Sequence, residues 1–138
     1  MSIDWKRFAE LISSSQDILL TSHIRPDCDA LGSELGMAGI LESLGKKVRI
    51  VNGHSTPNNL AFIDPQQRIR TIGENISAEE ALAGVDLLMI LDTSAWAQLG
   101  PMGDVIRQAQ CRKCVVDHHM SEDDLDAELF DADTDAEE

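Results

Sequence analysis

Apolar residues along this chain form short continuous runs that alternate with stretches of helical spacing. The continuous runs are typical of buried strands, and they lie at 17–21, 48–51, 85–91, 114–116 and, as a weaker candidate, 128–130. The helical spacings predict helices at 4–15, 30–44 and 103–110, and Gly45 is placed to end the second of them. Ser77 and Glu80 have the spacing of a capping box, which predicts a further short helix that ends near Gly84.

Strands that alternate with helices predict an α/β fold, in which a mostly parallel sheet of about five strands is flanked by helices on both faces. The 138 residues are enough for one such domain and too few for two. Prolines, asparagines and glycines interrupt 52–73, which we expect to be a loop with one short helical turn at 60–63. Ligands of such sheets bind beyond the carboxyl ends of the strands, so the residues that follow the strands are the candidates for a functional site.

The net charge of −14 is distributed unevenly along the chain. Residues 121–138 hold ten of the 25 acidic residues and no basic ones, which leaves 15 acidic and 11 basic residues, a net charge of −4, in the rest. We interpret 121–138 as a solvated acidic tail. Because the remainder is only mildly acidic, and two bound divalent cations would add about +4, the total charge does not exclude a nucleotide ligand.

Three cysteines do not make a disulfide framework, and reduced thiols favour a cytoplasmic location. Cys111 and Cys114 have the spacing of a redox or zinc motif, but no second pair completes a zinc site, and we interpret both as structural. No apolar run approaches the roughly 18 residues that cross a bilayer, and the N-terminal residues lack the features of a signal peptide. We therefore expect no membrane partner.

The stretch at 21–33 carries the densest group of reactive side chains. His23, Asp27 and Asp29 place one imidazole and two carboxylates within seven residues. Pro26 disfavours the α conformation for the residue before it, so we expect these groups on a strand-to-helix loop, where they can converge on a divalent cation such as manganese, zinc or magnesium. The alternative is an ordinary polar turn in which Asp29 caps the following helix.

Carboxylates and imidazoles also follow the later strands. These residues are Asp92, then Asp117, His118 and His119, and finally Asp131, Asp133 and Asp135. Together with the first group they exceed the needs of one ion and suit a pair of ions about 3.5–4 Å apart that share a bridging carboxylate. Such a pair activates water and stabilises charge on phosphorus, which indicates phosphoester hydrolysis. The helix start at 30–33, with free backbone amides and the small residues Gly32 and Ser33, would bind a phosphate beside the ions.

The same residues match, in order, the motifs of the DHH phosphoesterase family, which the chain resembles over essentially its whole length. The first motif runs from His23 to Ser33, the second is Leu91-Asp92, the third runs from Val115 to the triplet Asp117-His118-His119, and the fourth is Asp133. The resemblance is greatest to the branch with a second domain called DHHA1. That branch includes the RecJ-like exonucleases, oligoribonucleases and phosphoadenosine-phosphate phosphatases.

The resemblance implies a role for each matching residue. His23 and Asp27 would hold one manganese ion, Asp29, His118 and Asp133 would hold the other, and Asp92 would bridge the two, with Mg²⁺ or Co²⁺ as alternative metals. Asp117 would orient His118, and His119 would contact the phosphate or act as general acid. The implied substrates are short oligonucleotides or adenosine 3′,5′-bisphosphate.

The chain departs from the family pattern in three ways. Cys28 stands where members usually have glycine, and Gln98 stands where arginine is expected. The chain also stops just past the fourth motif, so we interpret residues 1–138 as a DHH catalytic domain without its DHHA1 domain. Because binding energy from the remote parts of the substrate is then lost, we expect weak activity from the isolated chain.

Two other functions stay open. The same metals could hydrolyse pyrophosphate or polyphosphate, or the fold could serve as a non-catalytic module for nucleotide binding or assembly. The absent domain and Cys28 favour the non-catalytic module. A homodimer is left open as the assembly.

Overall fold

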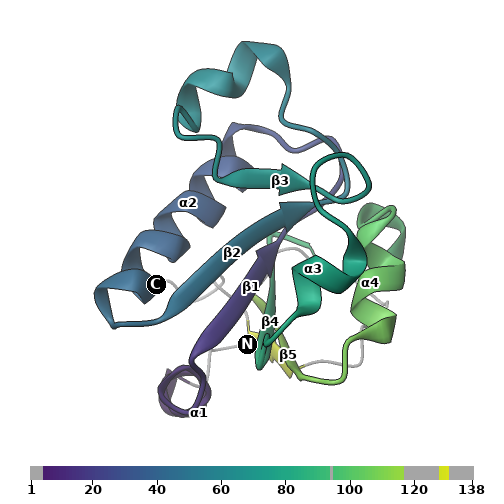
Figure 1. Cartoon of the computed structure of the whole chain (residues 1–138). Coiled ribbons are helices and arrows are strands. Elements are labelled where there is room, and N and C mark those ends of the chain that lie inside the picture. The colour runs from purple at the N-terminus through teal and green to yellow at the C-terminus, as the bar shows by residue number, and fades with distance from the viewer. Residues whose placement is uncertain (1–4, 94, 117–127, 131–138) are drawn as a thin grey trace.

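Six parallel strands form one sheet with helices on both faces in this computed structural model, which describes residues 5–93, 95–116 and 128–130 (Figure 1). The strands are β1 (Asp17–Thr21), β2 (Lys47–Asn52), β3 (Ile69–Thr71), β4 (Leu87–Leu91), β5 (Arg112–Val116) and β6 (Glu128–Phe130). Their order across the sheet is β3-β2-β1-β4-β5-β6. The predicted α/β fold with a parallel sheet is confirmed.

The helices follow the sequence signals closely. They are α1 (Trp5–Ser13), α2 (Cys28–Ser43), α3 (Ala78–Leu82) and α4 (Met102–Gln108), with 3₁₀ turns η1 (Asn58–Ile63) and η2 (Trp96–Gln98). The capping box is present: the Ser77 hydroxyl accepts from the Glu80 N–H and the Glu80 carboxylate accepts from the Ser77 N–H. Gly45 follows α2 with a φ of 84°, as its predicted role at the helix end requires. None of these helices, in the part of the chain described, has the length and apolar character needed to cross a membrane.

One strand lies where we predicted a loop. β3 pairs in parallel with β2, so that Ile69 lies opposite Ile50. Both carboxylate oxygens of Asp64 accept hydrogen bonds from the backbone, one from Arg68 and one from Ile69, at 2.9 and 2.8 Å, and these bonds turn the chain into the strand. The prediction of a loop was wrong here because three residues are too few to show a period, and pairing with β2 specifies the strand.

The sheet separates two hydrophobic layers because side chains alternate along each strand. All five residues of β4 are buried. Leu87, Met89 and Leu91 pack with α1 and α2 on one face, whereas Leu88 and Ile90 pack with α3 and α4 on the other. Figure 1 shows α2 on one side of the sheet and α3 and α4 on the opposite side. A strand covered on both faces is apolar at every position, which explains its continuous apolar sequence.

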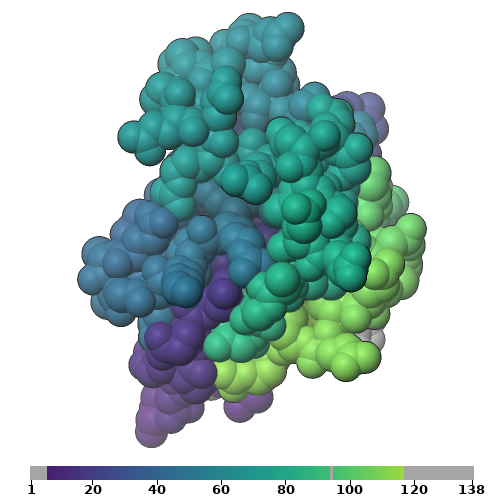
Figure 2. All heavy atoms as spheres, viewed as in Figure 1, coloured from purple at the N-terminus to yellow at the C-terminus, as the bar shows by residue number. Residues whose placement is uncertain are grey.

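The segment between β2 and β3 forms a lobe at one edge of the sheet. It includes η1, and Figure 2 shows it at the top of the molecule. The two terminal guanidinium nitrogens of Arg68 donate to the two carboxylate oxygens of Glu42 on α2, at 3.1 and 2.6 Å. This two-point contact ties the lobe to the helix that leads away from the candidate site.

Candidate metal site

The first and second family motifs meet where the sheet changes its direction of winding. The chain runs outward from β1 to β2 and β3, then returns to place β4 on the other side of β1. His23 lies two residues past the end of β1, and Asp92 directly follows β4. The crevice at such a switch point is the common ligand site of open α/β sheets. Strand order therefore brings together residues that are 69 positions apart in the sequence.

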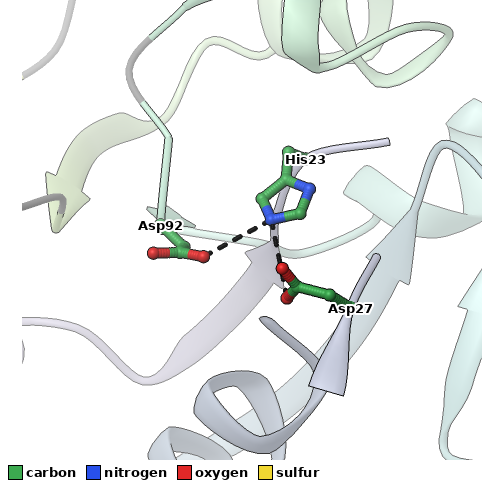
Figure 3. Close-up of side chains that lie close together, drawn as sticks. All are labelled: His23, Asp27 and Asp92. Atoms are coloured by element: carbon green, nitrogen blue, oxygen red, sulfur yellow. Dashed lines mark ion pairs between the residues drawn. The ribbon is translucent and has the colours of Figure 1, made fainter. Parts of the chain in front are cut away.

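His23, Asp27 and Asp92 form a compact cluster at this point (Figure 3). Nε2 of His23 lies 3.4 Å from Oδ2 of Asp92 and 3.9 Å from Oδ1 of Asp27. One ligand atom from each residue lies within 4.8 Å of the others. Two ligands that each bind an ion at about 2.1 Å lie at most about 4.2 Å apart, so both His23 contacts fit a shared ion.

The ring of His23 is oriented toward the two carboxylates by its own backbone. Nδ1 lies 2.8 Å from the carbonyl oxygen of Ile24, and because a carbonyl only accepts, Nδ1 carries the proton. Nε2, the other ring nitrogen, then faces the Asp92 carboxylate. In the imidazole form, the lone pair of Nε2 can bind a cation together with the carboxylate, which lies 3.4 Å away. The imidazole and carboxylate donors therefore fit a divalent ion such as Mn²⁺ or Zn²⁺.

Asp27 has a second function as the N-cap of α2. Its Oδ1 accepts a hydrogen bond of 2.8 Å from the Ala30 N–H, so Asp27 caps the helix, and the alternative in which Asp29 does so is wrong. The Asp27 side chain is 64% exposed, against 16% for His23 and 14% for Asp92. The cluster is therefore open to solvent, and to a substrate, on the Asp27 side.

Gly32 and Ser33 lie inside α2 rather than at its start. Because the helix begins at Cys28, their backbone N–H groups are positioned to bond to carbonyls four residues back, and the prediction of free amides at these residues is wrong. Both residues are exposed. A Cβ built on Gly32 would have no neighbouring atom of the described residues within 4 Å, apart from those of the helix itself, so this side of α2 is open. A role in phosphate binding stays a prediction for both.

The second predicted ion site falls largely outside the described residues. Asp29 lies in the first turn of α2 with an exposed side chain and does not belong to the cluster of three. Its predicted partners His118 and Asp133 lie outside the described residues, as do Asp117 and His119. The structure thus places the candidate ligands of one ion, and the second ion remains a prediction.

The backbone around the cluster is held by contacts that the sequence did not reveal. Asp92 has a left-handed φ of 65°, and its N–H donates to the carbonyl oxygen of Val116 at 2.9 Å. The N–H of Ile24 donates to the carbonyl oxygen of Gln98 at 2.6 Å. Gly100 packs directly against the side chain of Ile24. A Cβ on Gly100 would lie only 2.6 Å from Cγ2 of Ile24. Gly100 was visible in the sequence as a possible turn, but its contact with Ile24 could not be inferred from the sequence.

A pocket of about 340 Å³ adjoins the loop between His23 and Asp27. It is lined by Arg25, Pro26, Gly53, His54, Ser55, Pro57 and Glu74. Arg25 has a left-handed φ of 52°, and its N–H donates to Nδ1 of His54 at 3.4 Å. Arg25 and His54 were not predicted as site residues. The sequence around an exposed loop residue does not indicate which pocket its side chain lines.

Comparison with known proteins gives two findings. The family model described as the DHH family, N-terminal domain, matches residues 17–136. Among solved structures, an exopolyphosphatase-related protein from Bacteroides fragilis is similar, with a TM-score of 0.82 and 25% sequence identity. The match covers 91% of this chain and 37% of that one, so the chain spans little more than a third of the length of its solved relative.

Proposed function

Because the chain belongs to the DHH family, whose members are phosphoesterases, we propose that it is the catalytic part of a manganese-dependent enzyme with two metal ions. The proposed substrates are short oligonucleotides or adenosine 3′,5′-bisphosphate, as in the branch that carries a DHHA1 domain. The observation that carries the proposal is the convergence of His23, Asp27 and Asp92 at the switch point of the sheet. Nitrogen and oxygen ligands within reach of one ion are what metal-assisted hydrolysis requires.

Each residue has a defined part in this proposal. Bound ions would supply an activated water and neutralise charge at phosphorus. His23 presents Nε2 because its Nδ1 proton is held by a carbonyl, and the Asp27 and Asp92 carboxylates face it. Asp29, His118 and Asp133 are the proposed ligands of the second ion, with Asp92 as the bridge, Asp117 orienting His118 and His119 contacting the phosphate or donating a proton.

The pocket beside Arg25 supports a substrate with a further anionic group. Its volume of about 340 Å³ lies at the lower end of the range for small-ligand sites. Arg25 is exposed and lies between two proposed metal ligands in the sequence. A guanidinium makes strong charge-assisted hydrogen bonds to phosphate. We therefore propose that Arg25 binds a phosphate next to the one that is cleaved.

Hydrolysis of pyrophosphate or polyphosphate is the second candidate function. It is favoured by the solved relative, which is described as exopolyphosphatase-related. The same cluster would serve, because a phosphoanhydride needs the same stabilisation of charge on phosphorus. A non-catalytic nucleotide-binding module is the third candidate.

One assay separates these candidates. The 138-residue chain is incubated with Mn²⁺ and, in parallel, with a dinucleotide, adenosine 3′,5′-bisphosphate, pyrophosphate and polyphosphate. Weak release of mononucleotide or phosphate from the nucleotide substrates, lost in Asp92→Asn and kept in Asp104→Asn, is the expected result. Turnover of polyphosphate alone would favour the second candidate, and nucleotide binding without turnover the third. Equal activity of wild type and Asp92→Asn would refute the proposed site.

A further inference from the structure

Glu34 is a buried acid on the face of α2 that packs against the sheet. Its side chain is fully buried, and Oε1 accepts a hydrogen bond of 2.9 Å from Nδ2 of Asn52. Oε2 has no hydrogen-bond partner among the described residues. Burial, with a smaller contribution from the Asp64 carboxylate, raises the pKa of Glu34 to about 8, against the lowering effect of the Asn52 bond. A buried acid with an unmatched oxygen is costly compared with an apolar residue, so its presence calls for another role than packing.

Hydrogen bonds connect Glu34 to the backbone on both sides of the candidate metal site. Oδ1 of Asn52 accepts from the Ser22 N–H at 3.2 Å, and the Ser22 hydroxyl donates to the Leu91 carbonyl oxygen at 2.7 Å. Ser22 directly precedes His23, and Leu91 directly precedes Asp92. Ser22, Glu34 and Asn52 are all fully buried, so these bonds are shielded from competing water.

The acceptor at Glu34 strengthens the orientation of the Asn52 amide that the Ser22 N–H also favours. An amide can turn over and exchange its oxygen for its nitrogen, and only one of the two orientations presents Oδ1 to the Ser22 N–H. The acceptor Oε1 of Glu34 selects that orientation, because it requires Nδ2 on its own side. Without this acceptor, the Nδ2 group of Asn52 would be buried without its Glu34 partner, and the Ser22 N–H alone would hold the amide in this orientation.

We propose that Glu34 is a positioning residue of the metal site, which fixes the separation of His23 and Asp92 through Asn52 and Ser22. The inference rests on the proposed function, since it assumes that these two residues bind a metal. A site must hold its ligands to within about half an ångström, which is why such a supporting set of hydrogen bonds affects affinity. Among the described residues, the hydrogen-bond partner of Glu34 is Asn52, which is not one of the proposed ligands.

Calorimetric titration of the 138-residue chain with Mn²⁺ tests the proposal without any substrate. Glu34→Gln keeps an acceptor for Asn52, so its dissociation constant should stay within about twofold of wild type, whereas Glu34→Leu should bind about tenfold more weakly. Thr21→Val is the matched control, because Thr21 is fully buried, precedes Ser22 and has a hydroxyl without a partner among the described residues. It should bind as wild type does. Circular dichroism confirms that each variant is folded.

Wild-type affinity in a folded Glu34→Leu variant would overturn the inference, and so would equal losses in the Gln and Leu variants. If Glu34→Leu does not fold, Ser22→Ala replaces it, since it removes the bond to Leu91 with a small change in volume. Unchanged affinity in Ser22→Ala would then overturn the inference. Failure of the wild-type chain to bind Mn²⁺ is a different result, which would overturn the proposed function and the inference with it.

Discussion

The hydroxyl of Ser22 donates a hydrogen bond of 2.7 Å to the carbonyl oxygen of Leu91. This bond joins the ends of β1 and β4 one residue before His23 and one residue before Asp92. The separation of the two proposed ligands is therefore set by the backbone, before any ion binds. A site organised in this way loses less binding energy to the ordering of its ligands.

Asp92→Asn should remove metal binding and leave the fold intact. Asparagine tolerates the left-handed backbone that Asp92 adopts, at a φ of 65°, but it lacks the anionic ligand. We expect Mn²⁺ affinity to fall at least about tenfold, with the midpoint of thermal unfolding within about 3 °C of wild type in the absence of metal. Asp104→Asn makes the same change on an exposed turn of α4 and should bind Mn²⁺ normally. Normal binding by Asp92→Asn would show that this carboxylate is not a ligand.

Gly100→Ala should displace Ile24 and disturb the loop that carries His23. The new Cβ would lie 2.6 Å from Cγ2 of Ile24, at a backbone φ of 55°. The left-handed backbone and the overpacking together should cost about 2–4 kcal/mol in the free energy of unfolding, measured with urea. Gly45→Ala is the control, since it has a φ of 84° and no neighbouring atom within 4 Å among the described residues, and it should cost about 1–2 kcal/mol. Mn²⁺ binding should weaken only in Gly100→Ala, and equal effects of the two changes would contradict the contact.

Glu34 should make the chain less stable as the pH rises through neutrality. Its pKa is raised from 4.5 to about 8, so between these values the folded chain holds a proton that the unfolded chain has released. The free energy of unfolding then falls with pH by up to about 1.4 kcal/mol per unit from this group. Between pH 5.5 and 7.5, without metal, the free energy of unfolding of wild type should fall by about 2–3 kcal/mol more than that of Glu34→Gln.

Glu80→Gln is the control for that pH profile. Hydrogen bonds from the backbone and side chain of Ser77 lower the pKa of Glu80 below 4.5. The stability it contributes is present above its ordinary pKa and is lost as the pH falls through the lowered one. Glu80→Gln should therefore keep the wild-type slope between pH 5.5 and 7.5. If the free energy of unfolding changed with pH in the same way for wild type and Glu34→Gln, Glu34 would be ionised in the folded chain at pH 7.

Arg25→Asn should weaken substrate binding more than it slows turnover. Asparagine accepts the left-handed φ of 52° and removes the charge beside the pocket. For the substrate that the assay identifies, we expect KM to rise about tenfold and kcat to change by less than about threefold. Lys47→Asn removes a charge at the opposite end of the sheet, at the start of β2, and should leave both constants unchanged. An equal KM in the two variants would exclude a role for Arg25 in binding.

Several features of this fold could be predicted because they depend on residues close together in the chain. β4 was recognised from its continuous apolar run, since both of its faces are covered. The Ser77–Glu80 capping box and the turn at Gly45 depend on positions at most a few residues apart. The order of the family motifs likewise identified His23 and Asp92 as candidate ligands from their own sequence. Local spacing was therefore enough to predict the class of fold and the residues that could act as metal ligands.

The tertiary structure decided what the local pattern left open. The edge strand β3 forms because it pairs with β2. Asp27 caps α2 because the helix begins two residues earlier than its apolar spacing indicated. The set of Glu34, Asn52 and Ser22 joins positions 18 and 30 residues apart, which no periodicity records. Such contacts depend on the order of strands in the sheet, and that order follows from the packing of the whole chain. The sequence by itself determined which groups could bind a metal, and the sheet decided which of them meet.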